Sequence, residues 1–448
     1  TRTFRKLAYG LAFSCTFLTP AQAEDIMEVY TLAYDFDPIL KQARAARESI
    51  GENVNIAFSR FLPQISASAN TFGNRADKAK SSDTVEGYNT HDYGIDLDQS
   101  LFDNRNYVNH RISKINVSKA DAELNATLQD LIIRVADAYF RTLAAIDKVE
   151  FSKAEKKAIG RQLDQAQRRY EVGIIAITDV HEAQAGFDNA NAAVIAAENE
   201  LLVAKETLRE LTGKYIEEVD PLAEKIPLAP PSPEDINHWI DQALNGNFTL
   251  LAAKEGTSSA QENISLQRSG HYPTLGLRAS YGRFSNNGPG STLAHEKYDG
   301  LIGLNLSIPI YEGNAVTSRT RQAQYDFQQS QERYNEILNS TEKTTRSNYL
   351  SVISEVSRVK ALKQAVISNE SAVKATEAGF EVGTRTIVDV LNVQRDLFRA
   401  KQEYSNSRYI YILNILLLKQ ASGDLDRSDL ERVNLWLGDN PQKIKGGV

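Results

Sequence analysis

Histidine and cysteine, the residues that most often bind metals or act as nucleophiles, are few and widely spaced in this chain. None of the histidines belongs to an HExxH motif or to another spacing typical of metal ligands; they are His91, His110, His181, His238, His271 and His295. The one cysteine is Cys15. No nucleophile stands in a recognisable pattern with a general base. The sequence therefore predicts no metal site, no cofactor and no enzymatic activity.

Two nearly identical stretches contain other polar residues of interest. Residues 170–180 read YEVGIIAITDV and residues 380–390 read FEVGTRTIVDV, 210 positions apart. The same offset aligns Leu62-Pro63 with Tyr272-Pro273 and Tyr139 with Tyr349, and it holds through about 190 residues. A unit of this length indicates a tandem duplication, since the repeats of solenoids have only ~20–50 residues. We expect each half to form the same elements and each stretch to form the same corner.

The N-terminus has the features of an export signal. Arg2, Arg5 and Lys6 precede an apolar stretch from Leu7 to Leu18, and Ala21-Gln22-Ala23 fits a cleavage site. The apolar stretch is too short to span a bilayer. We therefore expect residues 1–23 to be a signal peptide. Its removal would take away the only thiol and change the formal charge from −7 to −10. No basic patch suited to nucleic acid is present.

The positions of proline divide the chain. No proline occurs between Pro63 and Pro221 or between Pro309 and Pro441, and inside both regions apolar residues recur at steps of three and four, as in a coiled coil. We expect long helical hairpins at about 104–213 and 313–422. The predicted domain organisation is a first repeat at 24–220, a proline-rich linker at 221–233, a second repeat at 234–423 and a C-terminal segment at 424–448.

Before each helical region the period of the sequence changes to two. Tyr93, Ile95 and Leu97 alternate with small or polar residues, and we expect strand pairs at about 62–103 and 272–312. This alternation fits outer-membrane strands, but a half-buried sheet of a soluble protein would also show it. Four strands cannot close a membrane barrel, whose minimum is about eight. A barrel would therefore need several chains, and the sequence does not choose three copies over two or four.

A duplicated unit of strand pair, long helix, VG corner and second long helix resembles the TolC family of outer-membrane efflux ducts. The amino-acid sequence is similar to that of the family at residues 24–30 (EDIMEVY), 176–180 (AITDV), 382–390 (VGTRTIVDV), 308–311 (IPIY) and 408–411 (RYIY). The resemblance covers nearly the whole mature chain. It implies a homotrimer that combines a twelve-stranded outer-membrane β-barrel, a long periplasmic α-helical barrel and a mixed equatorial belt. It also implies contact with outer-membrane lipid and recruitment by a periplasmic adaptor coupled to an inner-membrane pump or a type I secretion ATPase.

The same resemblance implies roles for residues around the two VG corners. Val172-Gly173 and Val382-Gly383 would form the periplasmic tips, where an adaptor docks. Thr178, Asp179 and Arg385 match positions that lock the closed entrance, and Asp389 matches a carboxylate that rings the constriction. Phe380 and Asn392 depart from the family pattern, because a gate tyrosine and a second ring carboxylate are familiar at these positions. Fewer polar contacts would hold the entrance closed, and the acidic ring would be weaker.

Other interpretations of these residues remain open. Asp179 would also fit the role of a helix N-cap or of a first-turn carboxylate. Asp389 would also fit as a charge on a solvated helix face, and Arg385 as the partner of a neighbouring carboxylate in an ion pair. Two other functions are conceivable for the whole chain. A soluble periplasmic coiled-coil adaptor or scaffold would explain the helices but not the strands, and an outer-membrane enzyme would need a catalytic constellation.

Overall fold

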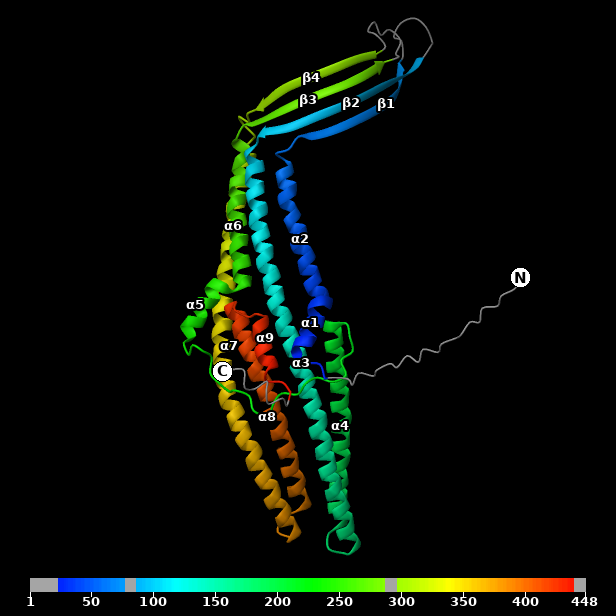
Figure 1. Cartoon of the computed structure of the whole chain (residues 1–448), viewed down its shortest axis with the longest axis vertical. Helices are drawn as coiled ribbons and strands as arrows, with labels where there is room; N and C mark the ends of the chain where they lie inside the picture. Colours follow the sequence, from blue (N-terminus) through cyan, green and yellow to red (C-terminus); the bar gives the residue numbers. More distant parts are fainter. Residues whose placement is uncertain (1–22, 77–85, 287–295, 439–448) are drawn as a thin grey trace, which may run out of the picture.

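The computed structural model describes residues 23–76, 86–286 and 296–438 of the chain. A β-sheet lies at one end of an elongated molecule, and two long helical hairpins reach the other end (Figure 1). The predicted signal peptide lies outside the described residues, apart from Ala23, and so does the last part of the predicted C-terminal segment. Both stay predictions.

The order of helices and strands occurs twice along the chain, with one additional helix at the end. The first series is α1 (Ile26–Phe36), α2 (Pro38–Ser59), β1 (Gln64–Ala76), β2 (Glu86–Phe102), α3 (Asn104–Glu171) and α4 (Ile177–Thr212). The second is α5 (Ile236–Gly246), α6 (Phe248–Arg268), the 3-10 turn η1 (Ser269–His271), β3 (Thr274–Asn286), β4 (Glu296–Ser307), α7 (Ala315–Glu381) and α8 (Ile387–Ser422), followed by α9 (Arg427–Asn434). The long helices α3 and α7 have 68 and 67 residues, so each extends for about 100 Å at ~1.5 Å per residue.

The sheet is antiparallel and follows chain order, β1-β2-β3-β4. In its register Ile95 lies opposite Tyr281 on one face, and Asp98 lies opposite Arg278 on the other. The apolar face is uncovered within the described chain, since Ile302 and Leu304 are 82% and 69% exposed. The outer edges of β1 and β4 pair with no other strand among the described residues. A mostly helical chain with a four-stranded sheet confirms the predicted mixture of elements.

The helices are arranged in the order of the strands to which they connect. Near the sheet, α2 packs on α3, α3 on α6, and α6 on α7. Toward the other end, α4 packs on α3, α3 on α8, and α8 on α7. Each long helix is therefore flanked by shorter helices that follow one another along its length (Figure 1). In the part of the chain that the structure describes, no helix is long and apolar enough to cross a membrane.

The main hydrophobic core lies at mid-height, where both halves of the chain meet. Phe140 of α3 stacks on Tyr409 of α8 with ring centroids 5.6 Å apart. The buried Tyr139 hydroxyl donates to the carbonyl of Asp220 at 2.9 Å, and the Tyr411 hydroxyl donates to that of Ala229 at 2.9 Å. The segment between the two halves is thereby fastened to the long helices.

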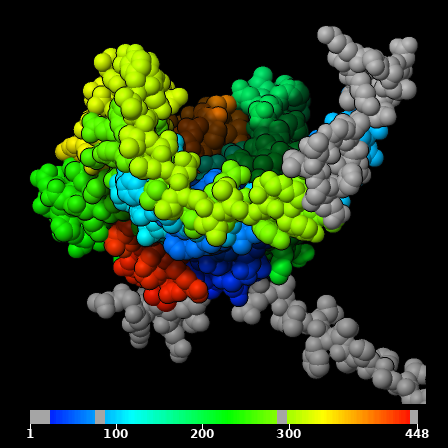
Figure 2. All heavy atoms as spheres, turned by 90° about the horizontal axis from the view of Figure 1, so that it is seen from above, coloured from blue at the N-terminus to red at the C-terminus, as the bar shows by residue number. Residues whose placement is uncertain are grey.

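The first and last helices lie on the same side of the molecule. Viewed along the long axis, the blue residues of α1 and α2 and the red residues near the C-terminus occupy one side of the surface (Figure 2). The Nδ2 atom of Asn434 in α9 donates to Asp25, the N-cap of α1, at 2.9 Å. The mid-height layer therefore includes both ends of the described chain.

Asp37 and Asn247, which the duplication aligns, cap the N-termini of α2 and α6. Each side chain accepts a hydrogen bond from a backbone N–H three residues on, at Leu40 and Leu250. Only Asp37 also forms an ion pair, with both Nη atoms of Arg134 at 3.0 and 2.8 Å. Burial by itself would raise the pKa of Asp37, but the bonds from Arg134 and Leu40 outweigh it and hold the pKa below its usual range.

We expect Asp37→Asn to keep the cap, as Asn247 does naturally, and to lose the ion pair. Breaking a buried pair costs about 3–5 kcal/mol, and we expect less here, about 1–3 kcal/mol, because Arg134 is partly exposed and keeps Asp130. The measurement is the difference in thermal unfolding temperature between wild type and variant. Because the pKa of Asp37 is depressed, its stabilisation is present above the ordinary carboxylate pKa of about 4 and is lost as the pH falls through the folded value.

The control is Asp37→Ala, which also loses the cap and should cost about 1 kcal/mol more than Asp37→Asn. A constant difference in unfolding temperature between wild type and Asp37→Asn from pH 7 to pH 3 would contradict this assignment of the ion pair.

Candidate functional site at the helical tips

Both hairpins turn at the end of the molecule farthest from the sheet (Figure 1). Gly173 and Gly383 occupy the turns with φ of 76° and 79°, a region that side chains with a Cβ resist. A Cβ built on either glycine would have no atom within 4 Å, so the backbone angle and not space requires glycine. The preceding Val172 and Val382 are 70% and 76% exposed. Each tip therefore presents an apolar side chain to its surroundings.

The two tips close with the same backbone hydrogen bonds. The N–H of Ile174 donates to the carbonyl of Arg169, and the N–H of Thr384 donates to that of Gly379, each at 2.8 Å. Such bonds satisfy carbonyls that the end of an α-helix leaves free. The repeated sequence therefore forms the same corner twice, as the duplication predicted.

The residues that begin the second helix of each hairpin differ between the two tips. The N-cap of α4 is Ala176, which offers no side-chain bond, and Asp179 lies in the first turn. The N-cap interpretation of Asp179 is therefore wrong and the first-turn interpretation is right. The exposed Thr178 and the partly exposed Asp179 make no side-chain hydrogen bond or ion pair with the described residues.

Asp389 occupies the equivalent position of α8 but belongs to a capping box. Its Oδ2 accepts bonds from the N–H and the hydroxyl of Thr386, both at 3.0 Å, while its own N–H donates to that hydroxyl at 3.2 Å. The bonds from the Thr386 N–H and hydroxyl, with the charge of Arg385, hold the pKa of Asp389 below its usual range. The carboxylate therefore stays ionised, and only one of its oxygens is used within the tip.

Arg385 stands at the exposed side of the same turn. Its N–H donates to the carbonyl of Gly379 at 3.2 Å, and its side chain lies against that glycine, where a Cβ would come within 2.8 Å of Arg385 Cγ. Its guanidinium forms no ion pair within the described residues. Arg385 therefore acts on the neighbouring carboxylate of Asp389 through its charge, without forming a close ion pair with it.

Phe380 is buried in a small core that joins the two hairpins near their tips. Phe380 belongs to α7, and its neighbours in this cluster come from the other three helices of the hairpins: Leu163 and Ala166 of α3, Ala183 of α4, and Ile387 and Val390 of α8. Arg169 of α3 lies over the Phe380 ring at 4.7 Å and donates from Nη1 to the Phe380 carbonyl at 3.2 Å. No local pattern in the sequence marks Arg169, because its partner lies 211 positions away.

Asn392 lies one helical turn after Asp389, on an exposed side of α8. Its Oδ1 accepts a bond from Arg395 at 2.9 Å. It borders a groove of about 360 Å³ between α3, α4 and α8 that also contains Glu155. Burial raises the pKa of Glu155, although the charges of Arg395 and Arg399 act in the opposite direction.

The site thus joins two glycine turns, an apolar contact between hairpins and several charged groups that face outward. Within the described residues no group of three metal-binding side chains comes together. The apolar contact fastens the two hairpins to each other near their tips, and charged groups of both tips stay exposed.

Comparison with known families agrees with this geometry. The family model described as "Outer membrane efflux protein" matches residues 29–214 and 239–424. The two matches lie in the two halves of the chain, and they include both hairpins and both strand pairs.

Individual proteins are similar over nearly the full length. The chain is 40% identical to the outer membrane protein TolC of Vibrio cholerae over 94% of this chain and 96% of that protein. It is 37% identical to TolC of Escherichia coli over 97% and 90%. The Campylobacter jejuni CmeC outer membrane channel shares its fold, with a TM-score of 0.76, 17% identity and 98% coverage of both chains. This chain therefore belongs to the outer membrane efflux protein family.

Proposed function

We propose that this protein is an outer-membrane exit duct of tripartite efflux pumps, type I secretion systems or both. The observation that carries the proposal is the sheet, whose apolar face is exposed at the end of two ~100 Å helical hairpins. A soluble scaffold would expose this apolar face to water at a high cost, whereas lipid would cover it. The helices then extend from the membrane far into the periplasm.

The duct would be a homotrimer with a closed twelve-stranded barrel. In lipid, the free N–H and C=O groups at the edges of β1 and β4 must find partners. Pairing β4 of one copy with β1 of the next satisfies both edges, and three copies of the four-stranded sheet reach a size typical of such barrels. The long helices beneath the strands would form a barrel of their own.

The resting duct would be closed at its tips. The side chains of Thr178 and Asp179 and the guanidinium of Arg385 make no hydrogen bond or ion pair with the described residues, and these groups would bind a neighbouring copy at the entrance. The contact of Arg169 with Phe380 would hold the two hairpins of one chain together in the same state. Phe380 lacks the hydroxyl of the tyrosine that is familiar at this position, and it contributes a buried ring and its backbone carbonyl instead.

Asp389 would form the constriction ring. Its capping box uses Oδ2 and leaves Oδ1 without a bond from the described residues. In a trimer three of these carboxylates would face one axis, where confinement strengthens their combined field. Asn392, one turn away, adds no charge to the ring.

The exposed tips would be the docking place of a periplasmic adaptor that couples the duct to an inner-membrane pump or a type I secretion ATPase. Val172 and Val382 supply exposed apolar contacts, and Gly173 and Gly383 set the shape of the turns. Cross-linking of an adaptor to cysteines placed at the two valines tests this contact directly, and its absence at both would contradict it.

We expect the detergent-extracted protein to have the mass of three chains, because a single sheet leaves two edges unpaired. Native mass measurement of the full-length protein gives the result. Deletion of β1 and β2, or of β3 and β4, should prevent assembly in the membrane. A monomer that retains a membrane-inserted barrel would contradict the trimer.

We expect Arg169→Gln to weaken closure, because it removes a cation–π contact and a hydrogen bond to Phe380 that together contribute about 1–3 kcal/mol. The expected result is a higher single-channel conductance in planar bilayers. Arg168→Gln is the matched control, because it removes the same charge from an exposed neighbour. Asp179→Asn and Arg385→Gln should also raise conductance. Wild-type conductance in all three test variants would show that these residues do not hold the entrance.

We expect Asp389→Asn to reduce block of the channel by cobalt hexammine added from the periplasmic side, because the ring charge is lost. Thr386→Ala is the control for the capping box, since it gives α8 the alanine cap that α4 has naturally at Ala176. It should retain the block. Asn392→Asp should tighten the block by adding charges one turn away. Equal block in wild type and Asp389→Asn would place the cation site elsewhere.

A further inference from the structure

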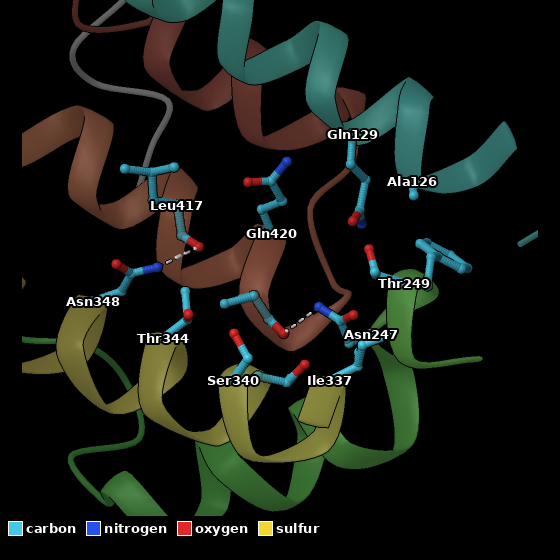
Figure 3. Close-up of a pocket in the computed structure, with 13 residues that line it drawn as sticks. Ala126, Gln129, Asn247, Thr249, Ile337, Ser340, Thr344, Asn348, Leu417 and Gln420 are labelled. Atoms are coloured by element: carbon cyan, nitrogen blue, oxygen red, sulfur yellow. Dashed lines mark hydrogen bonds between the residues drawn. The ribbon is translucent and has the colours of Figure 1, made fainter. Parts of the chain in front are cut away.

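Two hollows of this chain differ in the charge of their lining. At mid-height a pocket of about 420 Å³ has no charged residue in its lining, and the carboxamides of Asn247 and Asn348 bind backbone carbonyls of α8 there (Figure 3). Near the tips, the groove of about 360 Å³ between α3, α4 and α8 contains three charged residues, Glu155, Arg395 and Arg399. The volume of this groove is within the ~300–1,000 Å³ range of small-molecule sites.

The groove near the tips lies between the two hairpins. The first hairpin contributes residues 151–159 of α3 and 186–193 of α4, and the second contributes residues 391–402 of α8. A Cβ on Gly186 would lie 3.4 Å from Leu391 Cδ1, so α4 and α8 approach each other closely at this level. A molecule bound in the groove would therefore touch both hairpins.

Two arginines stand one helical turn apart at the exposed rim of the groove. Arg395 donates from Nη2 to Asn392 Oδ1 at 2.9 Å. Arg399 Nη1 lies 3.8 Å from Asp396 Oδ1 in an exposed pair, and such pairs contribute little. Because a guanidinium has several N–H donors, each arginine keeps donors for a ligand.

Glu155 is the one lining residue whose charge opposes an anion. Burial raises the pKa of its carboxyl, while the charges of Arg395 and Arg399 act in the opposite direction. No ion pair joins it to either arginine among the described residues. With Glu155 ionised, two cations and one anion still leave the lining with a formal charge of +1. The groove therefore favours an anion over a cation.

Apolar side chains line the groove behind the charged rim. The rings of Phe151 and Phe398 come from α3 and α8, with Ile159 and Leu391 beside them. All four side chains are partly or fully buried, whereas the two arginines are exposed. A ligand that matches both parts has an apolar body and an anionic group.

We propose that this groove binds a small aromatic carboxylate, with its ring against Phe151 and Phe398 and its carboxylate at Arg395 and Arg399. Guanidinium groups bind carboxylates through paired hydrogen bonds, and aromatic rings pack favourably in offset or edge-on arrangements. A cation would meet the two arginines at the rim, and an uncharged ring would leave them without a partner. An aromatic amino acid would add an ammonium that Glu155 would have to bind, and the test distinguishes it from the proposed ligand.

The test is isothermal titration calorimetry of the full-length, detergent-solubilised protein with 2-naphthoate. We expect saturable binding to a single site in each chain. Arg395→Gln combined with Arg399→Gln should weaken binding at least tenfold, because the carboxylate loses both guanidiniums. Arg161→Gln combined with Arg168→Gln is the matched control, since it removes two exposed charges from outside the groove. Glu155→Gln should tighten binding at least twofold, because the lining loses its one anion.

Ala193→Leu separates binding from folding. Ala193 is an exposed lining residue of α4, and leucine and alanine have similar helix propensities, so the unfolding temperature should not change. The leucine would nevertheless fill the groove and abolish binding. Ala192→Leu is the matched control, because Ala192 is an equally accessible neighbour outside the lining, and it should bind the probe normally.

Two analogues test the charge of the ligand. The uncharged 2-naphthamide and the zwitterionic 3-(2-naphthyl)alanine should each bind at least tenfold more weakly than 2-naphthoate. The proposal is overturned if 2-naphthoate does not bind saturably, if either analogue binds as tightly, if Glu155→Gln weakens binding, or if the double arginine variant or Ala193→Leu binds like wild type. The measurement requires no channel activity, so its result is independent of the proposed duct.

Discussion

The outer edges of β1 and β4, which pair with no other strand in the described part of the chain, are the constraint on which the rest of the structure depends. Antiparallel pairing in chain order fixes the sequence of the four strands, and each strand leads directly into or out of a helix. The order of α2, α3, α6 and α7 beside one another therefore follows from the sheet. In the proposed barrel neither edge can remain open in lipid, so the same order would continue into other copies of the chain.

Between α3 and α7, helix α6 occupies the half near the sheet and α8 the half near the tips. The two helices therefore meet at mid-height, where polar side chains bind the backbone at their ends. α8 ends at Ser422, and α6 begins at Phe248 in the same layer. Helix ends leave carbonyl and N–H groups unsatisfied, and Asn247 binds one of each, the carbonyl of Ala421 and the N–H of Leu250. Gln129 binds the carbonyls of Gly423 and Leu425 just beyond the end of α8. Carboxamides gather at this level because they bind these backbone groups.

Local features of this fold could be predicted from the sequence, while contacts across long separations could not. Three features depend only on residues that are neighbours in the sequence. They are the glycine turns at Gly173 and Gly383, the absence of proline from the long helices and the two-residue period of the strands. The capping box of Thr386 and Asp389 was also local and could have been found from the T-x-x-D spacing. Arg169 and Phe380 belong to different hairpins, and Gln129 binds carbonyls nearly three hundred positions away. Such pairs appear only after the helices are packed.

The duplication also affects how such a protein can change during evolution. A ring assembled from six copies of an unfused half would show every substitution six times around the axis. Fusion of two halves in one chain lets each half vary by itself, so that a substitution appears three times in a trimer. The difference between Ala176 and Thr386, or between Asn247 and Asp37, is of this kind. Gene fusion would thus let a trimeric duct vary its charge and stiffness three positions at a time, whereas six identical subunits would vary them six at a time.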